Sequence, residues 1–511
     1  MIVSKTNKYS ILFMVFVILI THFTSLGARI VHVTTYGSDE GDGSIYEPYA
    51  SIPKAIDELC AYDNPSPGDT IYVHEGTYPN EPVSGNWDPY GQYGTYIWIM
   101  GVPGENKPRL TRGETAYITS YKSAETPPHN FALKRLIFDK DDVGYHNINM
   151  CSWNPLSIAP PIEQGYIHNV IIDSCEFYNR RKSAAGIKMS GVDSFVIKNC
   201  TFNGFDGGGI GLNMDGCHYG EVYNNTFYRE RMSGILTKGG SHHIVIRNNF
   251  IKDCSPIGIA VGGDTWYEYC RPDTAQMEDP LCEARDIDAY SNVIIDCWIP
   301  IVFNCSRDSR VYNNQIIITD SLKNMSDSEG LIFSTTPGMI QFRETSGWCN
   351  VPPRDNKIYN NIFYFNKIRD YYYNIYFFLP NETHSDRYAS TIKIWNNLWY
   401  EYEDPSSSWK SWNSNGVWNC VDTTGVNIYA QDPRFVKNSD GIPIPTNGYS
   451  LGLRGIRITP PSGYEFKDFY GETYMDPPPI GAINISYEPE GPPIAPLMNR
   501  LIPANLGEKK D

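Results

Sequence analysis

One short pattern of alternating apolar and polar residues recurs along the middle of the chain. Its copies are VIIDSCEF from Val170, FVIKNCTF from Phe195, GEVYNNTF from Gly220, IVIRNNFI from Ile244, IDAYSNVI from Ile287, SRVYNNQI from Ser309, NKIYNNIF from Asn356 and IKIWNNLW from Ile392. Alternation with a period of two predicts a strand with one buried face. A strand this short cannot bury that face alone, so successive copies are expected to stack on one another.

The spacing of the copies predicts a solenoid. Their sixth positions are Cys175, Cys200, Asn225, Asn249, Asn292, Asn314, Asn361 and Asn397. The short intervals, of 22 to 25 residues, fit one turn, and the longer ones fit either a turn with a loop or two turns with one degenerate copy. Since no helical pattern separates the copies, we expect parallel strands in an all-β, single-domain, right-handed parallel β-helix over residues 29–486. Asn at the bend tolerates left-handed backbone angles and can bond to its equivalents in adjacent turns.

The cysteines fall into two groups. Cys175, Cys200, Cys254 and Cys297 occupy repeat positions, where small buried thiols are expected rather than disulfides. Cys270 and Cys282 flank a polar insertion, and we expect a disulfide to close it.

The two ends depart from the repeat. Residues 1–28 combine two lysines, a short apolar run and small residues, which predicts a secretory signal peptide, although an uncleaved anchor has the same appearance. The segment Ser51–Cys60 predicts an amphipathic helix with Ser51 as N-cap, placed between strands at Ile30–Val33 and Thr70–His74, that caps the open end of the solenoid. The repeat fades from about Asp432, and residues 487–511 form a Pro-rich tail.

The composition and charge of the chain limit the functions that the protein can have. The 511 residues are 41% hydrophobic and 20% charged, which fits a folded protein, and the net charge of -16 argues against nucleic-acid binding. No later segment is long and apolar enough to span a membrane. We expect a secreted monomer without stable membrane insertion once the signal is removed.

The chain resembles secreted parallel β-helix proteins of the pectate-lyase-like fold. HVTTYGSDEGDGSIYEPYASIPKAIDELC with PGDTIYVHEGTY resembles their N-terminal module, and QDPRFVKNSDGIPIPTNGYSLG with MDPPPIGAIN resembles their C-terminal module. The stretch GILTKGGSHHIVIRNNFIKDCSPIGIAVGGDT, residues 234–265, is similar to the lysine-bearing coil of calcium-dependent polysaccharide lyases. The resemblance implies a lyase that cleaves an acidic, uronate-containing polysaccharide, with Lys238 as the catalytic base and calcium as a cofactor.

The spacing around Lys238 suggests a second part of the site. Asp215 precedes Lys238 by 23 residues and Asp264 follows it by 26, so the three are expected to line one face of adjacent turns. Calcium prefers oxygen ligands, so Asp206, Asp215 and Asp264 are candidate metal ligands. Each Asp can instead cap a turn, and Lys238 can instead be a solvated surface lysine.

Further residues are candidates for substrate binding. Arg271 and Arg343 could bind acidic sugars, and His242 follows the lysine closely enough to assist, with His243 as a further acid or base. Two other functions remain open. A glycoside hydrolase on the same fold needs paired carboxylates, and a non-catalytic extracellular glycan-binding β-helix needs neither a base nor a metal.

Overall fold

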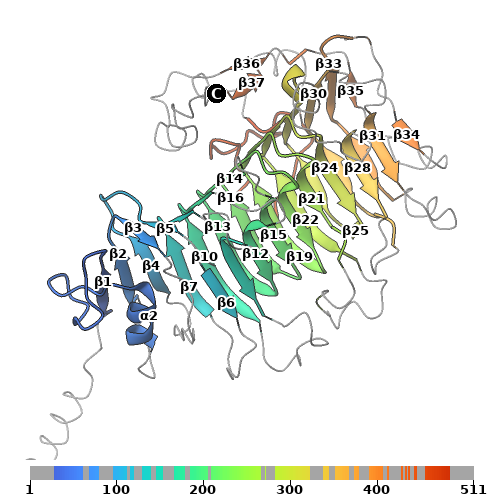
Figure 1. Ribbon diagram of the computed structural model, residues 1–511. Coiled ribbons are helices and arrows are strands. Elements are labelled where there is room, and N and C mark those ends of the chain that lie inside the picture. Colours follow the sequence, from blue (N-terminus) through green and yellow to red (C-terminus); the bar gives the residue numbers. More distant parts are fainter. Residues whose placement is uncertain are drawn as a thin grey trace, which may run out of the picture.

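The computed structural model describes most of the chain between residues 28 and 483. The described residues are 28–60, 68–79, 96–111, 116–119, 129–139, 146–152, 166–178, 184–204, 209–265, 271, 282–322, 338–344, 351–366, 373–378, 391–404, 406, 411–413, 427–429, 432–433, 435–437, 442–445 and 455–483. They wind as one parallel β-helix in which each turn contributes strands to three long sheets (Figure 1). The predicted all-β solenoid is therefore confirmed.

Each sheet is a stack of parallel strands from successive turns. Sheet A contains β1 Ile30–Val33, β2 Thr70–Val73, β4 Ile97–Gly101, β7 His129–Lys134, β10 Ile167–Asp173, β13 Val192–Lys198, β16 His218–Tyr223, β19 Ser241–Arg247, β22 Ala284–Tyr290, β25 Ser306–Arg307, β26 Arg310–Tyr312, β29 Lys357–Tyr359 and β32 Lys393–Trp395. Sheet B contains β3 Thr77–Pro79, β5 Arg109–Thr111, β8 Ile137–Asp139, β11 Glu176–Tyr178, β14 Thr201–Asn203, β17 Thr226–Tyr228, β20 Phe250–Lys252, β23 Val293–Ile295, β27 Gln315–Ile317, β30 Ile362–Phe365, β33 Leu398–Glu401 and β35 Ile428–Tyr429.

Sheet C forms the third side. It contains β6 Ala116–Thr119, β9 Ile148–Cys151, β12 Ala185–Ser190, β15 Ile210–Asp215, β18 Ser233–Lys238, β21 Ile257–Val261, β24 Ile299–Asn304, β28 Gly338–Arg343, β31 Tyr373–Phe378 and β34 Ser411–Asn413. A separate antiparallel pair, β36 Phe435–Lys437 and β37 Pro443–Pro445, lies outside the three stacks.

The repeated pattern marks the bend from sheet A to sheet B. Each copy runs from the end of an A strand into the next B strand, as in β10 to β11. The long intervals are single turns that carry loops, because β19 pairs directly with β22, β26 with β29 and β29 with β32. The second alternative, a degenerate extra turn, is therefore excluded at all three places.

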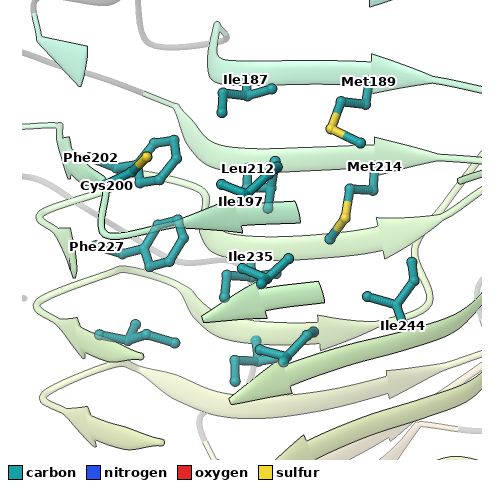
Figure 2. Close-up of a cluster of buried hydrophobic side chains, with 14 of the residues drawn as sticks. Ile187, Met189, Ile197, Cys200, Phe202, Leu212, Met214, Phe227, Ile235 and Ile244 are labelled. Carbon is teal, nitrogen blue, oxygen red and sulfur yellow. The ribbon is translucent and has the colours of Figure 1, made fainter. Parts of the chain in front are cut away.

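Like residues stack in register to fill the core. Phe138, Phe177, Phe202 and Phe227 form one pile, with ring centroids 5.3, 4.6 and 4.5 Å apart from turn to turn. Inward residues of sheet C form parallel columns of Ile, Leu and Met beside this pile (Figure 2). Alternate residues of each C strand consequently face outward, and these outward residues form the surface on which the candidate site lies.

Two adjacent residues have different structural roles at the bend from sheet A to sheet B. The asparagines at the sixth position form a buried ladder, in which the side-chain oxygen of Asn292 accepts from the backbone N–H (3.0 Å) and the side-chain amide (3.0 Å) of Asn249. The left-handed backbone belongs instead to the preceding residue, such as Asn248 and Asn313. The two roles expected of one position are thus divided between two neighbouring residues.

The repeat cysteines are buried thiols, as expected. Cys175, Cys200, Cys254 and Cys297 are free and buried. The thiol of Cys200 donates to the carbonyl of Lys198 at 3.1 Å. Cys282 is also buried, but Cys270 lies outside the described residues, so the expected disulfide stays a prediction.

The N-terminal end is capped by a helix, as predicted. Helix α2 spans Ile52–Cys60, and Ser51 accepts the N–H of Lys54 at 3.2 Å as its N-cap. The buried side chains of Ile52, Ile56 and Leu59 belong to the same hydrophobic core as the sheets.

The C-terminal segment 455–483 runs back along the finished coils. Its backbone carbonyls accept hydrogen bonds from the left-handed bend residues, for example Ser291 to Lys467 (2.8 Å) and Asn313 to Pro479 (2.7 Å). The predicted signal peptide, except for residue 28, and the predicted tail lie outside the described residues. Among the described residues, no helix is long and apolar enough to cross a membrane.

Candidate functional site

The outer face of sheet C collects a small set of charges. Its described strands contain four charged side chains, which are Lys188, Asp215, Lys238 and Arg343. Three are cationic and one is anionic, so this face is positive in a chain whose net charge is -16. A positive face on an acidic protein favours an anionic ligand.

Three of these charges form one cluster on consecutive strands. Asp215 and Lys238 are register partners on β15 and β18, and Lys238 Nζ lies 3.4 Å from Asp215 Oδ1. Lys188, on β12, contacts the other carboxylate oxygen of Asp215 from the opposite side. The two lysine side chains are 17% and 18% exposed, whereas the carboxylate is 8% exposed. The sequence-predicted neighbours Asp215 and Lys238 are thus brought together.

Lys188 differs electrostatically from a surface lysine. Burial, followed by the nearby charge of Lys238, lowers the pKa of Lys188 to about 7. A single carboxylate cannot fully compensate two neighbouring ammonium groups in a partly dry site. The cluster therefore favours the loss of one proton near neutral pH.

The turn after Lys238 is held from behind by a buried glutamate. Glu283 accepts the backbone N–H of Gly239 at 2.8 Å and both the N–H and the hydroxyl of Thr265 at 2.8 Å. Gly239 and Gly240 have φ values of 64° and 87°, which side chains rarely adopt. This turn fixes the strand end that presents Lys238.

Asp264 does not continue the column. The register after β18 pairs Thr237 with Val261, which places Gly262 rather than Asp264 beside Lys238. Asp264 is exposed on the following turn. Gly263 lies against the lysine instead, since a Cβ built there would be 2.8 Å from the Cβ of Lys238. Asp206 lies outside the described residues.

His242 lies on sheet A, around the corner from the cluster. It is buried and stacks on His218, with ring centroids 3.5 Å apart, and its Nδ1 lies 2.8 Å from Nδ1 of His243. His218 Nε2 lies 3.2 Å from the carbonyl of Gly240. These histidines thus back the turn that follows Lys238.

Arg271 also contacts the turns that join sheet C to sheet A after Asp215 and Lys238. Its guanidinium makes two hydrogen bonds to Asp193, at 2.6 and 2.9 Å, and one to the carbonyl of Gly216 at 3.2 Å. It lies over the ring of Tyr166, 3.4 Å from the centroid, and its backbone N–H donates to Gly239 at 3.0 Å. Arg271 therefore links the turn after Asp215, through its side chain, to the turn after Lys238, through its backbone.

Arg343 occupies the cluster's own face, further along the axis. It projects outward from β28, and its Nε donates to Gln341 at 2.7 Å. Burial lowers the pKa of its guanidinium to about 10, and Tyr376 acts in the opposite direction. No carboxylate among the described residues forms an ion pair with it, in contrast to Arg247, which pairs with Glu221.

Two buried acceptor oxygens in the cluster accept no hydrogen bond from the described residues, although one of them lies in the ion pair with Lys238. They are Asn213 Oδ1 and Asp215 Oδ1, on alternate outward positions of β15, in residues that are 8% and 6% exposed. Buried acceptors are normally satisfied. Both oxygens are shielded from solvent, so they belong to the interior of the cluster rather than to its ligand-accessible surface.

The described donors around Asp215 do not suit calcium. A hard cation needs several oxygen ligands, whereas this carboxylate is already flanked by two ammonium groups and Asp264 lies on a different turn. No group of three or more His, Cys, Asp or Glu residues that could hold a metal occurs in the described part of the chain. A calcium requirement stays a prediction, and no step below depends on it.

Comparison with known proteins agrees with the architecture. Residues 163–268 match the model of the right handed beta helix region, and the chain is a right-handed parallel β-helix, as predicted. No curated protein sequence matches.

Solved structures are similar over long stretches but distant. The A-module of a mannuronan C-5 epimerase from Azotobacter vinelandii is 14% identical with a TM-score of 0.44, covering 74% of this chain and 93% of that one. A rhamnogalacturonan lyase is 12% identical (TM-score 0.42; 75% and 89% covered), and a pectate lyase is 11% identical (TM-score 0.43; 90% and 98%). At these values the matches do not bear on the activity of this chain.

Proposed function

We propose that this protein binds an acidic polysaccharide along the outer face of sheet C and cleaves it by β-elimination, with Lys238 as the base. The supporting observation is the cluster of Lys188, Asp215 and Lys238 on three consecutive strands. It combines positive charge and a candidate base on one face.

The chemistry of a uronate determines what the cluster must do. Lys238 removes the proton from C5, the electron pair of that C–H bond forms the C4–C5 double bond, and the C4–O4 bond breaks. The departing oxygen takes a proton from water. Charge builds on the uronate carboxylate as the proton leaves, so a fixed cation beside it lowers the barrier. In its protonated form, which a pKa of about 7 favours below neutral pH, Lys188 is placed to supply that cation.

Asp215 has a positioning role in this scheme. Its two oxygens face two lysines, so it holds both amines on the same face of the sheet. It is the one carboxylate on the described strands of sheet C, so those strands do not carry the paired carboxylates that hydrolysis requires. Elimination therefore fits the described strands better than hydrolysis.

A screen of acidic polysaccharides tests the proposal. The protein is incubated with polygalacturonate, alginate, hyaluronan and gellan, with calcium or with a chelator, and the absorbance of the unsaturated product is followed. We expect product from at least one of them. Binding without product from any of them would instead favour the non-catalytic glycan-binding function, and neither binding nor product would reject both.

We also propose that the protein is secreted, on the basis of the lysines and apolar run in residues 1–28. Expression in a secreting host, followed by N-terminal sequencing of the protein in the medium, tests this. A mature chain that starts near residue 29 is expected. Retention of the intact chain in the cell membrane would favour the uncleaved anchor.

A further inference from the structure

The corner where sheet C turns into sheet A carries an exposed aromatic side chain. Tyr219, at the start of β16, is 58% exposed, whereas the other exposed tyrosines among the described residues, Tyr36 and Tyr46, lie in the segment between β1 and α2. Tyr219 follows Asp215 of the charged cluster by four residues. The exposed ring therefore lies one bend away from the cluster, on the same turn of the solenoid.

The backbone of Tyr219 is unusual for a residue of its size. Successive turns place a left-handed residue at this position of sheet A, and the series is Asn130, Asn169, Ser194, Tyr219, His243, Asp286 and Asp308. Asn, Asp and His adopt this conformation far more often than a bulky aromatic residue, for which a φ of 57° is an outlier. Strained residues of this kind are concentrated at ligand-binding positions. The side chain of Tyr219 is therefore a candidate for contact with a ligand.

The ring of Tyr219 is held in place from one side. The two stacked, buried histidines meet it edge to face, since its centroid lies 5.4 Å from that of His242 and 6.3 Å from that of His218, with interplanar angles of 85° and 90°. On the next turn, the ring of His243 lies 5.1 Å away and is tilted by 38°. Neighbouring rings thus fix Tyr219, while more than half of its surface faces solvent.

Polar groups follow the ring along the same column. The side chains of His243 and Asp286 are 48% and 40% exposed, and His243 Nδ1 lies 3.8 Å from Asp286 Oδ2. Both side chains can form hydrogen bonds with hydroxyl groups. The next residue in the column is a second exposed carboxylate, Asp308. These carboxylates would repel a uronate, so the column favours a neutral polar ligand.

We infer that Tyr219, His243 and Asp286 form a second glycan-binding site, at which a neutral sugar ring stacks on Tyr219 and its hydroxyls bond to His243 and Asp286. A pyranose has a face of C–H groups and a rim of hydroxyls, which matches an electron-rich aromatic face with polar groups beside it. A protein partner would need a larger contiguous apolar patch than one ring among polar side chains. The inference goes beyond the proposed function, because binding at this site needs no cleavage.

Affinity electrophoresis with neutral polysaccharides tests the second site. The parent protein is run through gels that contain xylan, galactan, galactomannan or β-glucan, and its retardation at increasing glycan concentration gives Kd. We expect at least one of these glycans to retard the parent. Tyr219→Asn should raise that Kd by about 3- to 10-fold, the range of one ring-stacking contact. Tyr219→Phe, which keeps the ring, should bind like the parent.

Melting temperatures separate a binding role from a packing role. Asn adopts the left-handed backbone more readily than Tyr, so Tyr219→Asn should melt at or above the parent temperature although it binds more weakly. Tyr46→Asn is the matched control, because it removes an exposed tyrosine far from the corner, and it should bind like the parent. A Tyr219→Asn variant that melts lower and binds like the parent would assign the ring to packing and overturn the inference.

The remaining outcomes also decide the inference. Weaker binding by Tyr219→Asn together with parent-like binding by Tyr219→Phe supports the second site at any melting temperature above that of the assay. An equal loss of binding in both variants would overturn the stacking role, since Tyr219→Phe retains the ring. If no neutral glycan retards the parent, the second site is rejected.

Failure of the second site and failure of the proposed activity are distinguishable. Product from an acidic polysaccharide, without retardation by any neutral glycan, would leave the lyase activity standing and reject the second site. Neutral-glycan binding that depends on Tyr219, without product from any acidic polysaccharide, would support the second site and reject the activity.

Discussion

Lys238 lies directly opposite Asp215 in the parallel register of β15 and β18, with Nζ 3.4 Å from Oδ1. Both side chains start from strands whose inward neighbours are locked in the core. Groups on strands are placed more precisely than groups on loops. The cluster is thus built into the solenoid rather than added to it.

Replacement of Lys238 should abolish activity without unfolding the protein. Proton abstraction by a positioned base contributes about 10²–10⁴-fold, so Lys238→Ala should reduce kcat by that factor. Its melting temperature should stay close to the parent value. Lys357→Ala, at an exposed position of sheet A, is the control and should keep full activity. A Lys238→Ala variant that retains activity within a few-fold would place the base elsewhere.

Gly263 offers a test of how tightly Lys238 is held. A methyl group there would come within 2.8 Å of the Cβ and 2.9 Å of the Cδ of Lys238, so the lysine side chain must shift. Displacement of a reacting group by about an ångström can cost on the order of 10²-fold. We expect Gly263→Ala to reduce kcat at least tenfold while circular dichroism is unchanged. Full activity would mean that Lys238 does not act in its present position.

The asparagine ladder should be a main source of stability. Asn292→Ala removes four side-chain hydrogen bonds, to Asn249, Ile246 and Asn314, and leaves buried groups unpaired. Since each such group costs about 1–3 kcal/mol, the loss should be at least about 3 kcal/mol in urea unfolding. Asn292→Cys, which copies the residue found at Cys200, should lose less. Equal losses would contradict the role assigned to the ladder.

Acid should destabilise the protein through His218. Burial is the main cause of a lowered pKa for this histidine, and the charges of Arg271, His242 and Arg285 lower it further. The carboxylate that faces it is Asp193, 3.8 Å from its Nδ1. Below pH 6.5 the unfolded state therefore binds a proton that the folded state resists. Stability should fall as the pH drops through 6.5, by up to about 1.4 kcal/mol per pH unit.

Urea unfolding at pH 7.5 and pH 5.5 measures this effect. The His218→Gln variant, which cannot be protonated, should show a smaller loss between the two pH values than the parent. The same loss in both proteins would assign the acid sensitivity to other groups.

The repeat made the architecture predictable from the sequence, because strand alternation and the Asn or Cys at each bend are local signals. The pairing of Asp215 with Lys238 followed from the short turn between them. Asp264 was misplaced by two residues, since equal spacing along the chain does not reveal where a turn ends. Lys188 was missed, although it lies about one turn before Asp215, because it sits on the neighbouring outward position. No sequence pattern indicated that Glu283 holds the turn after Lys238, because a long insertion separates it from Gly239.

The returning segment 455–483 has a consequence for biosynthesis. The coils around Asn248, Ser291 and Asn313 are synthesised first, but the carbonyls that satisfy their side chains arrive only with the last part of the chain. A ribosome-bound chain therefore has a folded β-helix in which the bend side chains along one edge still lack their hydrogen-bond acceptors. Chains truncated before residue 455 should still form the coils but should associate through that edge. Segment 455–483 therefore covers the exposed edge of the solenoid once the coils have folded.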